Sequence, residues 1–172
     1  FSNFLENKLG VENVVKVSRS FDGFEISDEE SVSKFSESIE GTFNLIINAT
    51  GVLQTTEEGP EKTINAVKKK LMIDIMMINA IGPALLLKHF CNKLDKTKFS
   101  VFVNLSARVG SITDNRLGGW ISYRSSKAAL NQIIKTSSIE INRRNKNAIC
   151  VGLHPGTVKT SFTEKFQNST KT

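Results

Sequence analysis

Two side chains suited to acid–base chemistry stand four residues apart in the second half of the chain. Tyr123 and Lys127 lie in the stretch Ile121–Asn131, which is predicted to be helical. A step of four places them on one helical face, about 5–6 Å apart at Cβ. A free phenol has a pKa of about 10, and a neighbouring ammonium group lowers it. Such a pair can pass a proton to or from an alcohol or carbonyl oxygen, although the same spacing also occurs by chance in many helices.

The elements around this pair predict an α/β fold. Three apolar runs that end in small or polar residues are predicted to be strands: Phe43–Ile47, Phe99–Ser106 and Ala148–Leu153. Helices are predicted from Asn65 to about Leu94 and from Ser122 to about Arg144. Strands that alternate with helices indicate a parallel sheet with helices on both faces. Ligands of such sheets bind beyond the carboxyl ends of the strands.

Several motifs follow one another along the chain at compatible intervals. They are Asn48-Ala-Thr-Gly51, Asn79-Ala-Ile-Gly-Pro83, Asn104-Leu-Ser-Ala-Arg-Val-Gly-Ser111, Gly118-Gly-Trp-Ile-Ser-Tyr-Arg-Ser-Ser-Lys-Ala-Ala-Leu-Asn131 and His154-Pro-Gly-Thr-Val-Lys-Thr160. Through them the chain, from about Leu9 to about Phe166, resembles the short-chain dehydrogenase/reductase family in its C-factor-like or carbonyl-reductase-like branch. The resemblance implies a single domain over residues 1–172 with a Rossmann-like, doubly wound parallel sheet in a three-layer α/β/α arrangement.

The resemblance also implies an NAD(P)-dependent oxidoreductase that moves a hydride between nicotinamide and a carbonyl or alcohol substrate. Tyr123 would donate the proton in carbonyl reduction and accept it in alcohol oxidation. Lys127 would lower the pKa of Tyr123 and bind the nicotinamide ribose. Asn79 would hold a water molecule in the proton relay; the alternative is a helix-interior asparagine satisfied by its own backbone.

The serine of the family's active site is displaced in this chain. Counting back from Gly110 in the family's Ser-x-x-Gly pattern, its position falls on Ala107. Ser106 precedes that position and Ser111 follows Gly110. Because the chemistry needs only a hydroxyl donor near the developing charge, we select Ser106 as the catalytic serine. The alternative is a strand-end serine that caps a backbone group.

The cofactor residues are likewise implied by the resemblance. They are Arg19, Glu25, Asn48, Ala49, Gly51, Lys127, Pro155, Gly156, Thr157 and Thr160. Arg19 follows the strand-like run Asn13–Val17, where a cation suits the 2′-phosphate of NADP. NADP is therefore the expected cofactor and NAD the alternative, while an exposed surface arginine is the alternative interpretation of Arg19. Glu25 stands where the family has an aspartate facing the adenine.

The family opens with a strand and a glycine-rich turn that cradles the pyrophosphate, and neither is found here. The predicted amphipathic helix Phe1–Leu9 resembles the helix that follows this turn. The final strand of the family is not found either, so the chain resembles an internal fragment with an incomplete sheet. A sheet without its first strand leaves backbone groups unpaired. Either the sequence omits residues of the protein, or the fragment pairs its strands differently or fills the gap with a neighbouring chain. In the second case it would bind cofactor weakly or not at all.

Composition argues against nucleic acid and metal ions as partners of this chain. The chain has 172 residues, 39% of them hydrophobic, enough for one core. The net charge is +6, and the basic residues are spread along the chain. They are not clustered with aromatic side chains on which bases could stack, so a nucleic-acid partner is not expected. His89 and His154 have no partners at metal-ligand spacing. Cys91 and Cys150 are expected to be free thiols.

The apolar run Leu71–Leu87 contains Asp74, Asn79, Gly82 and Pro83, so it is predicted to be a core helix rather than a membrane span. In the family this helix packs against its counterpart, which implies a homodimer or homotetramer. The sequence thus predicts a cytoplasmic enzyme acting on a small molecule. The alternative is a catalytically weak or inactive binding or signalling protein on the same scaffold.

Overall fold

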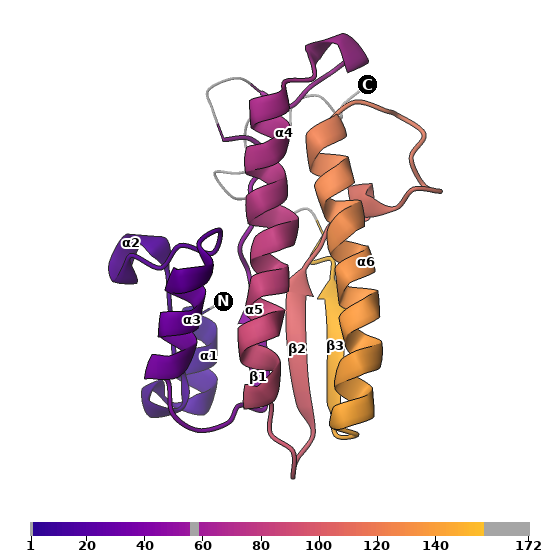
Figure 1. Ribbon diagram of the computed structural model, residues 1–172. Helices are drawn as coiled ribbons and strands as arrows, with labels where there is room; N and C mark the ends of the chain where they lie inside the picture. The colour runs from indigo at the N-terminus through magenta and orange to yellow at the C-terminus, as the bar shows by residue number, and fades with distance from the viewer. Residues whose placement is uncertain (1, 56–58, 157–172) are drawn as a thin grey trace.

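Three parallel strands form the sheet of the computed structural model, which describes residues 2–55 and 59–156 (Figure 1). They are β1 (Leu45–Asn48), β2 (Ser100–Leu105) and β3 (Ala148–Leu153), in the order β1-β2-β3. Asn48 lies opposite Asn104, and Asn104 lies opposite Gly152. The strands therefore end together, and the Rossmann-like parallel α/β fold with an incomplete sheet is confirmed.

The helices connect these strands in the predicted order. Before β1 come α1 (Ser2–Leu9), η1 (Val11–Asn13), α2 (Arg19–Asp22) and α3 (Glu29–Ser38). Between β1 and β2 come η2 (Ile64–Ala66), α4 (Lys69–Met76), the π-helical η3 (Met77–Ile81), α5 (Gly82–Phe90) and η4 (Cys91–Lys93). Between β2 and β3 come η5 (Arg108–Gly110) and α6 (Ile121–Arg144). The two long predicted helices are confirmed, although the first begins at Lys69 rather than at Asn65.

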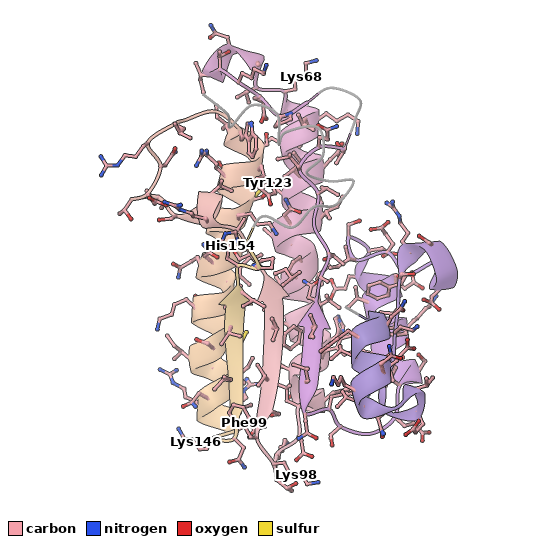
Figure 2. The ribbon with its side chains drawn as sticks, turned by 180° about the vertical axis from the view of Figure 1, so that it is seen from behind. Lys68, Lys98, Phe99, Tyr123, Lys146 and His154 are labelled. Atoms are coloured by element: carbon pink, nitrogen blue, oxygen red, sulfur yellow. The ribbon has the colours of Figure 1, made fainter. Side chains whose placement is uncertain are left out.

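The core lies between one face of the sheet and the helices α5 and α6, which run side by side in front of the strands in Figure 1. Alternate residues of β2 point to this face, as the two-residue period of a strand requires. Phe102 is fully buried there and packs in one cluster with Leu87, Leu130 and Ile134. Figure 2 shows the other side, where no described helix covers β2 and β3.

The expected strand Asn13–Val17 is wrong. Asn13 belongs to η1, and the four residues after it join no strand. A strand exists only through hydrogen bonds to a neighbour, and no described strand lies between this segment and β1. Val15 and Val17 instead line a groove whose other wall includes Leu45 and Ile47 of β1.

The helical stretch Lys69–Lys93 is long and apolar enough to cross a bilayer by length and composition. Its residues Leu71, Ile75, Leu87 and Phe90 are nevertheless buried within the domain. Since 39% of the apolar window is buried within the described residues, the core-helix interpretation stays a prediction.

The position of Phe102 at the centre of the core makes a stability prediction. We expect Phe102→Ala to lower the free energy of unfolding by about 3–5 kcal/mol, because it leaves a cavity between the sheet and the helices. Phe99→Ala is the matched control, since Phe99 is 65% exposed at the far end of the sheet; it should change stability by less than about 0.5 kcal/mol. Chemical denaturation measures both values, and similar losses in the two variants would contradict this core.

Candidate active site

The acid–base pair lies at the carboxyl end of the sheet. Tyr123 and His154 lie toward this end in Figure 2, while Phe99 and Lys146 mark the opposite end. Both residues lie in the first two turns of α6 and are buried, with exposed fractions of 8% for Tyr123 and 4% for Lys127. The Nζ atom of Lys127 lies 5.9 Å from the centre of the Tyr123 ring. The predicted helical step of four therefore brings the two side chains together, as the sequence indicated.

Burial controls the charge of Lys127. Its Nζ donates a hydrogen bond to Leu105 O at 2.9 Å, at the last residue of β2. Loss of hydration disfavours the ammonium form and lowers the pKa of Lys127 to about 8. The side chain is thus still mostly cationic at pH 7, yet close to the range in which it titrates.

The phenol behaves differently from the sequence expectation. Burial raises the pKa of Tyr123 above its ordinary value, so the expected lowering by Lys127 is not what the free protein shows. The physical reason is that burial removes the phenolate from water and so disfavours the charged form. The ring of Trp120 covers Tyr123 edge to face, with 6.3 Å between centroids.

Gly110 allows the segment after β2 to lie directly against α6. A Cβ at this position would stand 2.8 Å from the backbone carbonyl carbon of Lys127 and 2.9 Å from its oxygen. Neither backbone atom can give way without moving the helix. This close approach fixes the height of Lys127 above the end of the sheet.

Asn79 is fully buried in the π-helical η3. Its Oδ1 accepts a hydrogen bond from Val52 N, and its Nδ2 donates to Val52 O, both at 2.8 Å. Nδ2 also donates to Ser126 Oγ at 3.1 Å. Both amide hydrogens are thereby used, so the side chain joins the loop after β1 to α6. The alternative interpretation, in which the Asn79 side chain bonds to the backbone of its own helix, is wrong. Its hydrogen-bond partners are the backbone of Val52, in the loop after β1, and Ser126 in α6.

A groove of about 520 Å³ runs along the free edge of β1 and over its carboxyl end. Its lining includes five of the predicted cofactor residues: Arg19, Glu25, Asn48, Ala49 and Gly51. A Cβ on Gly51 would stand 3.3 Å from Lys127 Nζ and 3.4 Å from Asn79 Oδ1. Neither Tyr123 nor Lys127 lines the groove, so Gly51 lies between the groove and the ammonium group of Lys127.

Arg19 and Glu25 lie together at the side of the groove away from α6. The Oε1 atom of Glu25 accepts hydrogen bonds from Ser27 Oγ at 2.7 Å and Ser27 N at 3.2 Å. The Ser27 hydroxyl and, to a smaller extent, the charge of Arg19 lower the pKa of the Glu25 carboxyl group. This part of the groove thus contains one cation and one carboxylate, and the cofactor roles of Arg19 and Glu25 stay predictions.

Asn48 shapes the turn that leaves β1. Its Oδ1 accepts hydrogen bonds from Thr50 N at 3.0 Å and Thr50 Oγ1 at 2.6 Å. Its Nδ2 donates to Asn104 Oδ1 at 2.9 Å, across the β1–β2 pair. These bonds hold the backbone of Ala49 and Gly51 open along the groove.

Ser106 follows β2 directly, and its hydroxyl donates to Asn131 Oδ1 at 2.6 Å. Its N–H donates to Leu153 O at 2.9 Å, which extends the β2–β3 pairing. Ser106 therefore lies at the predicted edge of the sheet, and its hydroxyl donates its hydrogen bond to the third turn of α6. Its catalytic role stays a prediction.

The remaining predicted residues lie at the end of the described chain. Pro155 and Gly156 follow β3, are exposed and do not line the groove, and Gly156 adopts a φ of +80°. Thr157 and Thr160 lie outside the described residues. Within residues 2–55 and 59–156, no group of three or more His, Cys, Asp or Glu side chains could hold a metal ion. Cys91 and Cys150 are free thiols, as expected.

The sequence prediction missed two residues that hold this site in place. Asn131 binds Ser106, and the buried carboxyl group of Glu61 contacts the first turn of α6 through Ser122. Asn131 is the last residue of the motif Gly118–Asn131, but its position there does not indicate a partner. No local sequence pattern indicates the role of Glu61, because its contact with α6 spans 61 residues of sequence.

Comparison with known proteins gives a consistent result. Residues 9–171 match the family model described as short chain dehydrogenase. An uncharacterised oxidoreductase of Schizosaccharomyces pombe is 31% identical over 79% of this chain and 51% of its own length. The C-signal protein of Myxococcus xanthus is 31% identical over 71% of this chain and 69% of its own. The NADPH-bound carbonyl reductase from chicken fatty liver superposes with a TM-score of 0.64 at 28% identity, over 80% of this chain and 60% of that one.

The chain thus spans about half the length of the S. pombe relative.

The buried ammonium group makes a pH-dependent stability prediction. The pKa of Lys127 is about 8 in the folded protein, against an ordinary 10.5. The resulting cost is full below pH 8, shrinks as the pH rises toward 10.5 and is absent above that. We expect Lys127→Met to raise the free energy of unfolding at pH 7 by about 1–3 kcal/mol, allowing for the lost bond to Leu105.

Urea titrations at a series of pH values measure this gain, which should vanish at high pH. Lys135→Met is the matched control, because Lys135 is exposed on the same helix and its removal should change little. A lower stability of Lys127→Met at pH 7 would contradict a burial cost at this site.

Proposed function

Because this chain belongs to the short chain dehydrogenase family, we propose that it carries the acid–base and cofactor residues of an NAD(P)-dependent oxidoreductase. The reaction would interconvert a carbonyl compound and an alcohol, both small molecules. The observation that carries the proposal is the meeting of two structures at Gly51. Gly51 lines the groove beside β1, and Lys127 Nζ lies against the same glycine.

Each residue of the site would have a separate role in the proposed reaction. The nicotinamide, when bound, would supply or accept the hydride. Tyr123 would donate its phenolic proton to the carbonyl oxygen in reduction, and would take it back in oxidation. Burial keeps the phenol protonated, which suits the donor role. Lys127 would bind the ribose hydroxyls. The water-holding role of Asn79 stays a prediction; its hydrogen bonds to Val52 and Ser126 would also hold the loop after β1 against α6.

NADP is the cofactor that we propose. Arg19 lines the groove, and a guanidinium group suits a 2′-phosphate. The chicken carbonyl reductase, to which this chain is similar, was solved with NADPH bound. Arg19 also lies close enough to Glu25 to lower the pKa of that carboxyl group, so the phosphate would compete with this neighbour for the cation. For the assembly we propose a homodimer or homotetramer.

A second candidate is a binding or signalling protein without efficient turnover. Ala107 has no hydroxyl at the family's serine position, and the hydroxyl of Ser106 is given to Asn131. The similarity to the C-signal protein fits this candidate as well. Titration with NADPH, and an assay of its oxidation with a panel of aldehydes and ketones, separates the two. Absence of both binding and oxidation would reject the enzyme and leave the second candidate.

The proton donor can be tested by removing one oxygen atom. We expect Tyr123→Phe to lower kcat by about 10²–10⁴-fold, because it removes the phenolic proton that the proposed reaction transfers. The Kd for NADPH should change by less than about twofold, since Lys127 and the groove are unaltered. Ser138→Ala removes a hydroxyl from the exposed part of the same helix and is the control. Undiminished turnover in Tyr123→Phe would refute the assignment.

Cofactor choice can be tested at Arg19. We expect Arg19→Gln to weaken NADPH binding by about tenfold or more while leaving NADH binding within about twofold, because only NADPH carries the 2′-phosphate. Arg143→Gln, at the exposed end of α6, controls for the loss of one positive charge. Equal changes for the two cofactors would show that Arg19 does not select between them.

A further inference from the structure

Glu61 is a buried acidic residue to which the proposed reaction gives no role. It belongs to the loop between β1 and η2, and its exposure is 3%. A carboxyl group is removed from water only where other groups replace its hydration. In this structure those groups come from the beginning of α6, which also carries the acid–base pair.

Three hydrogen bonds join Glu61 to this helix end. Ser122 Oγ donates to its Oε1, and Ser122 N donates to its Oε2 at 3.4 Å. Trp120 N donates to the backbone oxygen of Glu61 at 2.5 Å. The first N–H groups of a helix have no partner within the helix and attract negative charge. Glu61 therefore caps α6 from a distant part of the chain.

The helix has no side-chain cap of its own to do this. Trp120, at the cap position, adopts a φ of +51° and makes no side-chain capping bond. Gly119 before it has a φ of +64°, and a Cβ there would stand 3.4 Å from the backbone oxygen of Glu61. The loop around Glu61 thus sets the path by which the chain enters α6.

That path determines where Tyr123 lies. Trp120 and Ser122, both bonded to Glu61, stand three residues and one residue before the phenol. The Trp120 ring also contacts the Tyr123 ring edge to face. A shift of the first turn of α6 would therefore move the phenol, while Lys127 is held separately by Leu105 and the Gly110 contact.

We propose that Glu61 is a positioning residue that holds the first turn of α6, and with it Tyr123, in the orientation needed for proton transfer. This role rests on the proposed oxidoreductase function, but its geometric part does not need turnover. The sequence contains one tyrosine and one tryptophan, which are Tyr123 and Trp120. The near-ultraviolet circular dichroism of the protein therefore reports directly on this contact.

The test compares Glu61→Ala, Glu61→Gln and Ser122→Ala with the control Glu140→Ala, which removes an exposed carboxylate from the far end of α6. We expect Glu61→Ala to change the near-ultraviolet spectrum well below its Tm and to lower kcat by about tenfold to a hundredfold. The Kd for NADPH should stay within about twofold. Glu61→Gln keeps an oxygen acceptor and should recover most of both signals. Combining Glu61→Ala with Ser122→Ala should add little to the effect of Glu61→Ala, because the two residues share one interaction.

A purely structural cap gives another result. In that case Tm falls, while the spectrum below Tm and kcat match those of the unmodified protein, and the proposal is overturned. If Glu61→Ala does not fold, Ser122→Ala and Glu61→Gln decide, since an unchanged spectrum and kcat in Ser122→Ala would also overturn it. If the unmodified protein shows no turnover, the oxidoreductase proposal fails on its own. The spectrum then still decides whether Glu61 orients Tyr123.

Discussion

The contact between η5 and the backbone of α6 is the constraint on which the site depends. Gly110 has no side chain, so the segment after β2 approaches the Lys127 peptide as closely as two backbones can. This approach sets α6 over the end of β2 and brings Lys127 Nζ to the Leu105 oxygen. Once Lys127 is placed, the loop after β1 must pass beside it at Gly51, where no side chain intervenes. The groove and the acid–base pair are neighbours because two glycines allow these two approaches.

The same packing sets the electrostatics. A phenol and an ammonium group that are both nearly excluded from water each favour their neutral forms, so the pKa of Tyr123 rises while that of Lys127 falls. In the free protein the tyrosine is therefore a protonated donor rather than a ready base. A bound molecule that added negative charge near Lys127 would raise the pKa of that side chain again and keep it cationic over a wider pH range. The direction of proton transfer thus depends on what occupies the groove.

The sequence predicted the parts of this arrangement that depend on local pattern. The apolar run of β2, the length of α6 and the four-residue step from Tyr123 to Lys127 all follow from neighbouring residues, and the structure agrees. Prediction failed where the local structure depends on a residue that is distant in the sequence. The run Asn13–Val17 has strand-like residues but no described neighbour to pair with, and the contacts of Glu61 cross 61 residues of sequence. The pKa of Tyr123 could not be predicted either, because its burial depends on how Trp120 and the surrounding loops close over it.

The hydroxyl of Ser106 has one more consequence for the chemistry. It is committed to Asn131, which follows Tyr123 by eight residues, about 12 Å of helix rise. While Ser106 keeps that bond, its hydroxyl proton is not available to another acceptor, and Ala107 has no hydroxyl. In the proposed reaction, stabilisation of a developing negative charge at the substrate oxygen would then depend first on Tyr123. A buried phenol with a raised pKa is suited to this, because it remains a hydrogen-bond donor until the proton is transferred.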